Sequence, residues 1–139
     1  MGNLKIADKL RSSGLRPTQQ RIQIAKFLFE REKTFHFTVE DLDNLINSKL
    51  KEEKISLATF YNTVHAFKKA GHLKEIHTQS NKIYFDTNVS SHHHFFDQKN
   101  NNLTDIDKNQ IELKKIPKAP KGKTIKDIEV VINVENDSH

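Results

Sequence analysis

The 139-residue chain contains no cysteine. Disulfide bonds, thiolate metal sites and cysteine nucleophiles are therefore excluded. Side chains can hold a metal here only through imidazole and carboxylate groups, and this combination suits Mn(II), Fe(II) or Zn(II). No zinc site built from cysteine pairs can stabilise the fold.

The chain also lacks long apolar runs. No segment approaches the roughly 18 apolar residues of a membrane span. The N-terminus has no apolar core of the kind found in signal peptides, so we expect a cytoplasmic protein. The HExxH, GxSxG and phosphate-loop motifs are absent, which argues against an enzyme.

Positive charge is concentrated in the first part of the chain. Residues 1–86 contain 15 Lys and Arg against 10 Asp and Glu, whereas residues 87–139 contain 8 of each class. The whole formal excess of +5 therefore lies in the first segment. A basic segment followed by a neutral one indicates a part that binds a polyanion and a part with another task.

Residues 56–71 are predicted to form a helix that enters a DNA groove. The first residue, a serine, is a suitable N-cap, and the last, a glycine, can end the helix in the left-handed conformation. Phe60, Val64 and Phe67 repeat at helical spacing and predict one apolar face. The opposite face carries groups that suit base edges and phosphates, namely Thr59, Tyr61, Asn62, His65, Lys68 and Lys69. An ordinary amphipathic helix whose polar face meets only water is the alternative.

The neighbouring segments favour the DNA-binding interpretation. Spacing and capping residues predict helices over residues 3–13, 18–29 and 38–50, and alternation predicts a hairpin from residues 73–77 and 82–86. This order of elements is the plan of a winged helix-turn-helix domain whose hairpin is the wing. We therefore assign residues 1–86 to that domain, and the small polar residues 87–91 to a hinge.

Residues 92–139 are predicted to form a small α/β domain. We expect a hairpin from residues 92–97 and 103–106, a short helix over residues 107–116, and a strand over residues 125–134. A part of about 50 residues lies near the lower size limit for a domain that is stable alone. We expect it to complete its core by dimerisation, and the predicted fold class is α+β.

Several ordered motifs resemble the ferric uptake regulator (Fur) superfamily. They are Leu15-Arg16-Pro17-Thr18 with Arg21, the segment from Phe37 to Leu42, the segment from Ser56 to Thr63, and the triplet His92-His93-His94. Within the superfamily the chain is most similar to the iron response regulator (Irr) branch. Phe60-Tyr61-Asn62-Thr63, His94-Phe95-Phe96, and Ile116 to Gly122 leading into Asp127 to Ile132 are typical of that branch.

This resemblance implies a homodimeric transcription regulator of iron or haem homeostasis that binds an AT-rich, roughly palindromic operator. Tyr61 and Asn62 would lie on the recognition helix and Arg16 near the minor groove. A tyrosine can pack on a thymine methyl group, an asparagine can pair with adenine, and an arginine favours a narrow AT-rich minor groove. The expected DNA-binding residues are Arg16, Thr59, Tyr61, Asn62, Lys68 and Lys69.

The resemblance also implies a regulatory metal site. Its expected ligands are His36, Asp86, His94 and Asp105, drawn from both domains. A metal held in this way would fix the relative orientation of the domains and so change the affinity for DNA. Phe96 occupies a position that is often a second histidine ligand, so we expect this site to lack one nitrogen donor.

A second metal site or a haem site is expected to involve His92, His93 and Glu112. Phe95 replaces an acidic ligand of the family, and the expected C-terminal histidine is not evident, so we expect this site to be weakened or absent. The Irr resemblance makes the histidine triplet a candidate haem-binding region, because imidazole is a competent axial ligand. A solvated hairpin edge is the alternative explanation of the triplet.

Three other functions stay open at this point. The first is a DNA binder whose sensory site has decayed. The second is a metallohydrolase built from histidine and carboxylate ligands, which would need an open metal position and a general base. The third is a winged helix that binds only proteins, and it predicts no salt-dependent affinity for DNA.

Overall fold

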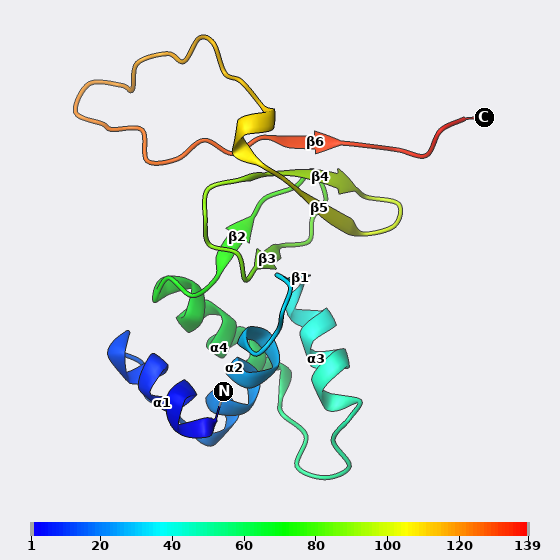
Figure 1. The fold of residues 1–139 in the computed structure, drawn as a ribbon. Coiled ribbons are helices and arrows are strands. Elements are labelled where there is room, and N and C mark those ends of the chain that lie inside the picture. The colour runs from blue at the N-terminus through cyan, green and yellow to red at the C-terminus, as the bar shows by residue number, and fades with distance from the viewer. Residues whose placement is uncertain (1, 139) are drawn as a thin grey trace. The chain divides into compact units, whose positions relative to one another are not determined.

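The computed structural model describes residues 2–138, which divide into two compact units (Figure 1). The first unit contains residues up to 77 together with residues 81–89, and the second contains residues 78–80 and those from 90 onward. Met1 and His139 lie outside the described residues. Within the described part of the chain, no helix has the length and apolarity needed to cross a membrane. The domain bounds and the hinge expected from the sequence stay predictions.

The first unit contains four α-helices, α1 (Asn3–Ser12), α2 (Gln19–Phe29), α3 (Val39–Asn47) and α4 (Leu57–Lys69). The start of each of the last three is fixed by a hydroxyl side chain that accepts a hydrogen bond from the first turn: Thr18, Thr38 and Ser56. The Asp41 carboxylate accepts a hydrogen bond from the backbone N–H of Thr38, which completes a capping box. Gly71, with φ of 88°, follows α4 and adopts the left-handed conformation expected there. These helix starts confirm the capping predictions.

One hydrophobic core holds the helices together. The three residues predicted to form the apolar face of α4, Phe60, Val64 and Phe67, are 0%, 1% and 0% exposed, which confirms that prediction. Leu4 of α1 and Leu45 of α3, in contrast, are 78% and 41% exposed. The buried stripe of α1 runs through Ile6, Ala7 and Leu10, and that of α3 runs through Val39, Leu42 and Ile46. Leu4 and Leu45 therefore lie off the stripes of their helices.

A three-stranded antiparallel sheet completes the first unit. Its strands are β1 (His36–Phe37), β2 (Lys74–Ile76) and β3 (Tyr84–Asp86), in the order β1-β3-β2. The pairing of β2 with β3 confirms the predicted wing hairpin. The short strand β1 was not predicted, and Phe37 anchors it by stacking on Phe85 of β3 with ring centroids 5.8 Å apart.

The second unit is built on a sheet of three strands, β4 (His93–Asp97), β5 (Asn102–Ile106) and β6 (Val131–Asn133). Their order is β5-β4-β6, with β5 antiparallel and β6 parallel to β4. The predicted hairpin is confirmed. The predicted helix over residues 107–116 is wrong, because only a single 3-10 turn, η1 (Lys108–Gln110), forms there.

The connection from η1 to β6 is irregular where the sequence predicted a helix over residues 107–116 and the first part of a strand over residues 125–134. Residues 111–130 contain no helix or strand and loop out from the sheet (Figure 1). Asp107 makes no side-chain capping bond at η1, and Ile111 is already extended, with φ of −120° and ψ of 123°. Only residues 131–133 of the strand expected over residues 125–134 are assigned to β6.

Candidate metal centre and DNA-binding face

Two histidines and one aspartate of the second unit converge on one face of its sheet. His94 on β4 lies directly opposite Asp105 on β5, and His92 precedes His94 by two residues, which places both rings on the same side. The Nε2 atoms of His92 and His94 lie 3.1 and 3.2 Å from the same oxygen, Oδ1 of Asp105. The two ring centroids are 4.4 Å apart. Each of the three residues offers a ligand atom within 4.8 Å of the others.

The hydrogen bond made by the other ring nitrogen of His92 fixes its tautomer. Nδ1 of His92 lies 2.7 Å from the carbonyl oxygen of Ser90. A carbonyl oxygen can only accept, so Nδ1 carries the hydrogen, and Nε2 of the neutral ring directs a lone pair at Asp105. A lone pair facing a carboxylate is repulsive unless a proton or a metal cation lies between them. The donor set therefore fits a cation.

Glu129 approaches the opposite side of the His94 ring. Its Oε1 atom lies 3.4 Å from His94 Nδ1, and the His94 side chain is fully buried. A carboxylate in this position favours the tautomer with hydrogen on Nδ1, which leaves the Nε2 lone pair for a metal. Sequence analysis missed Glu129, because nothing in the sequence indicated that this part of the chain returns beside His94.

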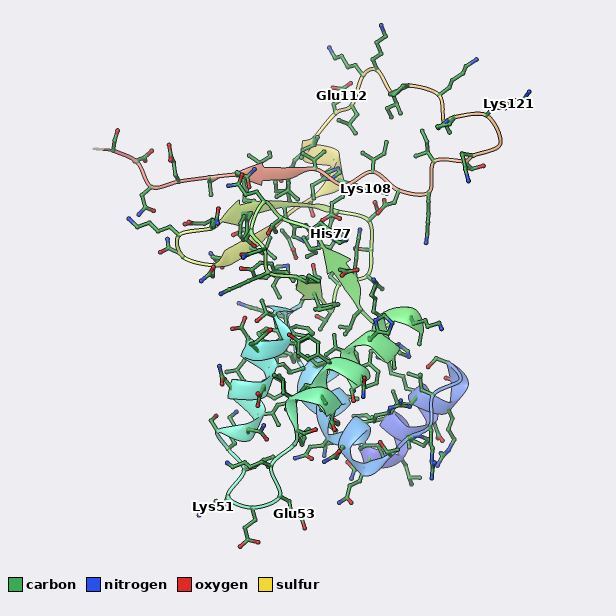
Figure 2. The ribbon with its side chains drawn as sticks, turned by 180° about the vertical axis from the view of Figure 1, so that it is seen from behind. Lys51, Glu53, His77, Lys108, Glu112 and Lys121 are labelled. Atoms are coloured by element: carbon green, nitrogen blue, oxygen red, sulfur yellow. The ribbon has the colours of Figure 1, made fainter. Side chains whose placement is uncertain are left out.

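His93 points to the other face of β4 and has a different role. Its Nδ1 accepts a hydrogen bond of 2.9 Å from the backbone N–H of Val130, just before β6. Glu112 is exposed and lies in the loop after η1 (Figure 2). Within residues 2–138, His93 and Glu112 belong to no group of three or more potential ligands. The structure therefore groups His92 with His94 and Asp105 and leaves His93 and Glu112 apart.

The other two expected ligands form a pair in the first unit. His36 on β1 lies opposite Asp86 on β3, and its Nε2 atom is 3.0 Å from Asp86 Oδ2. Asp86 is fully buried, and its Oδ1 accepts a hydrogen bond from the backbone N–H of Asn88. Two ligands are fewer than the four or more that the candidate metals take, so this pair is not a complete site by itself.

The polar face of α4 presents most of the predicted DNA-binding residues. Tyr61, Asn62 and Lys69 are exposed, as is Arg16 ahead of α2. The Tyr61 hydroxyl donates a hydrogen bond to the Glu40 carboxylate, and this bond raises the pKa of Tyr61 above its usual value. The Tyr61 ring is therefore held as the neutral phenol at physiological pH.

Like Tyr61, two further predicted DNA-binding residues have partners within the first unit. Lys68 forms an ion pair with Glu75 on β2, which links α4 to the wing. Thr59 is partly exposed, and its hydroxyl lies 2.9 Å from that of Ser56 at the helix start. Lys68 and Thr59 consequently contribute to the local structure of α4 whether or not they contact DNA.

The profile of the ferric uptake regulator family matches residues 12–133. The chain belongs to this family. One curated relative, the peroxide-responsive repressor PerR of Staphylococcus epidermidis, is 30% identical over 74% of this chain and 66% of its own length. Another, the ferric uptake regulation protein of Haemophilus ducreyi, is 34% identical over 60% of this chain and 56% of its own. The matched part spans less than two thirds of the length of these Fur-family relatives.

Solved structures of the Fur family share the fold. The ferric uptake regulator of Pseudomonas aeruginosa with manganese has a TM-score of 0.69 at 21% identity, covering 94% of this chain and 97% of its own. The ferric uptake regulator of Francisella tularensis with iron has a TM-score of 0.68 at 18% identity, covering 90% of this chain and 94% of its own. These similarities confirm the α+β fold class. The expected likeness to the Irr branch and the expected haem site stay predictions, since the relatives described above are named for peroxide response and ferric uptake.

Proposed function

We propose that the protein is a homodimeric, DNA-binding transcription regulator whose affinity for DNA depends on a bound divalent metal. The observation that carries this proposal is the convergence of His92 and His94 on Asp105. Two imidazoles that share one carboxylate oxygen, with the His92 lone pair directed at that carboxylate, form a donor set that a divalent cation would satisfy. Membership of the Fur family supports both the regulatory role and the metal dependence.

We propose that a single metal ion takes its ligands from both units: His36, Asp86, His92, His94 and Asp105. The donors of each unit are too few for a closed site, and together they give three imidazoles and two carboxylates, which suit Fe(II), Mn(II) or Zn(II). When bound, the metal would supply the positive charge that offsets the repulsion between the imidazole lone pairs and the carboxylate oxygens. A ligand set divided between the units would couple metal occupancy to the orientation of the winged helix. This arrangement rests on the family resemblance and on the donor chemistry.

For DNA recognition, we propose that Tyr61 and Asn62 contact bases and that Arg16 enters an AT-rich minor groove. Lys69, which is exposed on the last turn of α4, would contact a phosphate. Lys68 and Thr59 would support these residues, since both already have partners in the first unit. A homodimer would place two such helices on an AT-rich palindromic operator.

The test is a titration of metal-free protein into a labelled AT-rich palindrome and a scrambled duplex at fixed salt. Mn(II), Zn(II) and, without oxygen, Fe(II) are compared. We expect the effective metal to raise operator affinity by about 5- to 150-fold, and a chelator to reverse the change. Operator binding that is equal with and without every metal would identify a decayed sensor. No binding to either duplex would reject a DNA-binding function.

The effector can be tested in the same assay. The resemblance to peroxide-responsive relatives makes hydrogen peroxide one candidate, and the predicted likeness to the Irr branch makes haem another. Each is added to the metal-loaded complex, and release of operator identifies the signal. The labelled duplex is examined for cleavage at the end, because metal-dependent hydrolysis would favour a metallohydrolase.

Metal binding itself is measured without DNA. We expect His92→Ala to lower metal affinity in calorimetric titrations. His77→Ala is the matched control, because His77 is an exposed histidine outside the cluster. Equal affinities in the two variants would remove His92 from the proposed ligand set.

A further inference from the structure

Charge in the second unit is strongly segregated along the chain. Residues 108–126 contain seven lysines and one acidic residue, Glu112. The other positions from 87 to 139 contain one lysine and seven acidic residues. The apparent neutrality of this part of the chain therefore conceals a strongly basic segment, which we call the lysine segment. Its lysines are Lys108, Lys114, Lys115, Lys118, Lys121, Lys123 and Lys126.

The lysine segment has no internal partner for its charge. All seven lysines are exposed, and within residues 2–138 none forms an ion pair or a side-chain hydrogen bond. Some basic residues elsewhere are paired, as Lys68 is with Glu75 and Arg11 with Asp8. Most of the lysine segment belongs to the loop between η1 and β6, and Figure 2 shows Lys121 at the far end of that loop. The segment therefore presents uncompensated positive charge to a partner.

The composition of the lysine segment indicates what kind of partner it fits. It contains no arginine and no aromatic residue, the side chains that most often read base edges or stack on bases. Lysine is a flexible point charge that suits phosphates without selecting a sequence. In an extended chain, lysines two or three residues apart are about 7–11 Å apart. Duplex DNA carries one charge per about 1.7 Å of helix axis, so each lysine can meet a phosphate.

A lipid surface fits this segment less well. Leu113, Ile116 and Ile125 are exposed between the lysines and could in principle enter a bilayer interface. An interfacial segment, however, needs its apolar residues on one face of a helix. Pro117, Pro120 and the absence of helix from residues 111–130 prevent such a face from forming.

We propose that the lysine segment binds the sugar-phosphate backbone of duplex DNA, as a sequence-independent contact in addition to that of the winged helix. This inference rests on the proposed DNA-binding function. Once α4 engages its site, a contact in the same chain forms at high effective concentration, so that weak individual lysine–phosphate pairs add to the total affinity. The segment raises affinity for operator and for unrelated DNA alike.

The test compares two triple variants of the full chain in its metal-loaded form. The first is Lys118→Gln, Lys121→Gln, Lys123→Gln, and the matched control is Lys33→Gln, Lys51→Gln, Lys99→Gln, which removes the same charge at exposed positions outside the segment. Affinities for operator and scrambled duplexes are measured from about 50 to about 200 mM salt. Circular dichroism and thermal melting check that both variants are folded.

We expect the segment variant to bind both duplexes more weakly by a similar factor. The slope of log affinity against log salt is expected to become less steep by up to about 0.9 for each phosphate that the variant no longer neutralises. The control is expected to change the slope less. An unchanged slope in the segment variant, or an equal change in the control, overturns the proposed DNA contact while leaving the proposed function intact.

Two further outcomes are decisive. If the wild-type chain binds neither duplex with any metal, the proposed function and this inference fail together. Anionic phosphatidylserine vesicles are the other probe. Vesicle capture that the segment variant abolishes, combined with an unchanged DNA salt slope, would assign the segment to a membrane surface and overturn its binding to DNA.

Discussion

At the scale of single residues, three adjacent histidines of identical chemistry have two different roles. Alternation along β4 directs His92 and His94 to one face and His93 to the other. The sequence could predict that the triplet was a candidate ligand group, but not which members lie on the same face as Asp105. That distinction depends on the register with Asp105 and on the return of the chain at Val130.

The first residue-scale prediction concerns His93. The His93 ring accepts a hydrogen bond from the backbone N–H of Val130, so His93→Ala is expected to leave a partly buried donor without its partner and to lower the free energy of unfolding by about 1 kcal/mol. Metal affinity should change much less than in His92→Ala. Urea unfolding and calorimetric metal titration of the two variants measure the contrast. Loss of metal binding in a fully stable His93→Ala protein would show that His93 is a ligand instead.

A second prediction concerns Glu129, which lies beside the Nδ1 edge of His94. Glu129→Gln is expected to weaken metal binding by about 10- to 100-fold, because the carboxylate orients the ring and increases the basicity of Nε2. Titration with Mn(II) and Zn(II) measures this change. Glu112→Gln is the matched control, since Glu112 is exposed in the loop just after η1 and lies outside the ligand group. Equal metal affinities of the two variants would leave Glu129 without a positioning role.

At the scale of elements, the sequence predicted those whose signals are local. Capping hydroxyls and the spacing of Phe60, Val64 and Phe67 were sufficient to place α4, and capping residues placed the starts of α2 and α3. The strand β1 was missed because two residues give no measurable alternation, and its pairing with β3 depends on contacts distant in sequence. The sequence signal that could have predicted β1 is the stretch Thr34-Phe35-His36-Phe37-Thr38, which is rich in β-branched and aromatic residues.

The polar face of α4 yields a prediction about selectivity. Asn62 is exposed and can make a bidentate contact with adenine. Asn62→Ala is expected to reduce discrimination between operator and scrambled duplex by about 1–3 kcal/mol, while the oligomeric state is unchanged. Footprinting and competition binding measure the discrimination. Lys51→Ala, on the exposed connection between α3 and α4, is the control, and wild-type discrimination by Asn62→Ala would contradict the assignment of this face to bases.

At the scale of the whole molecule, the sheet of the second unit separates two tasks. One face carries His92, His94 and Asp105. The other face carries Phe95 of β4 and Ile132 of β6, which are directly paired in register and are each 39% exposed. An exposed apolar pair on a small sheet, beside the short edge strand β6, is suited to burial against a second copy of the chain.

This separation leads to a prediction about assembly. Phe95→Lys is expected to convert the dimer into a monomer, because a charge replaces apolar area at the centre of the proposed interface. Metal binding should persist, since the proposed metal ligands of the second unit lie on the opposite face of the sheet. Leu4→Lys is the matched control, because Leu4 is an exposed leucine of α1 in the other unit. Light scattering after gel filtration gives the oligomeric state, and the monomer is expected to bind a palindrome no more tightly than an isolated half-site. A Phe95→Lys protein that remains dimeric and still favours the palindrome would place the interface on another surface.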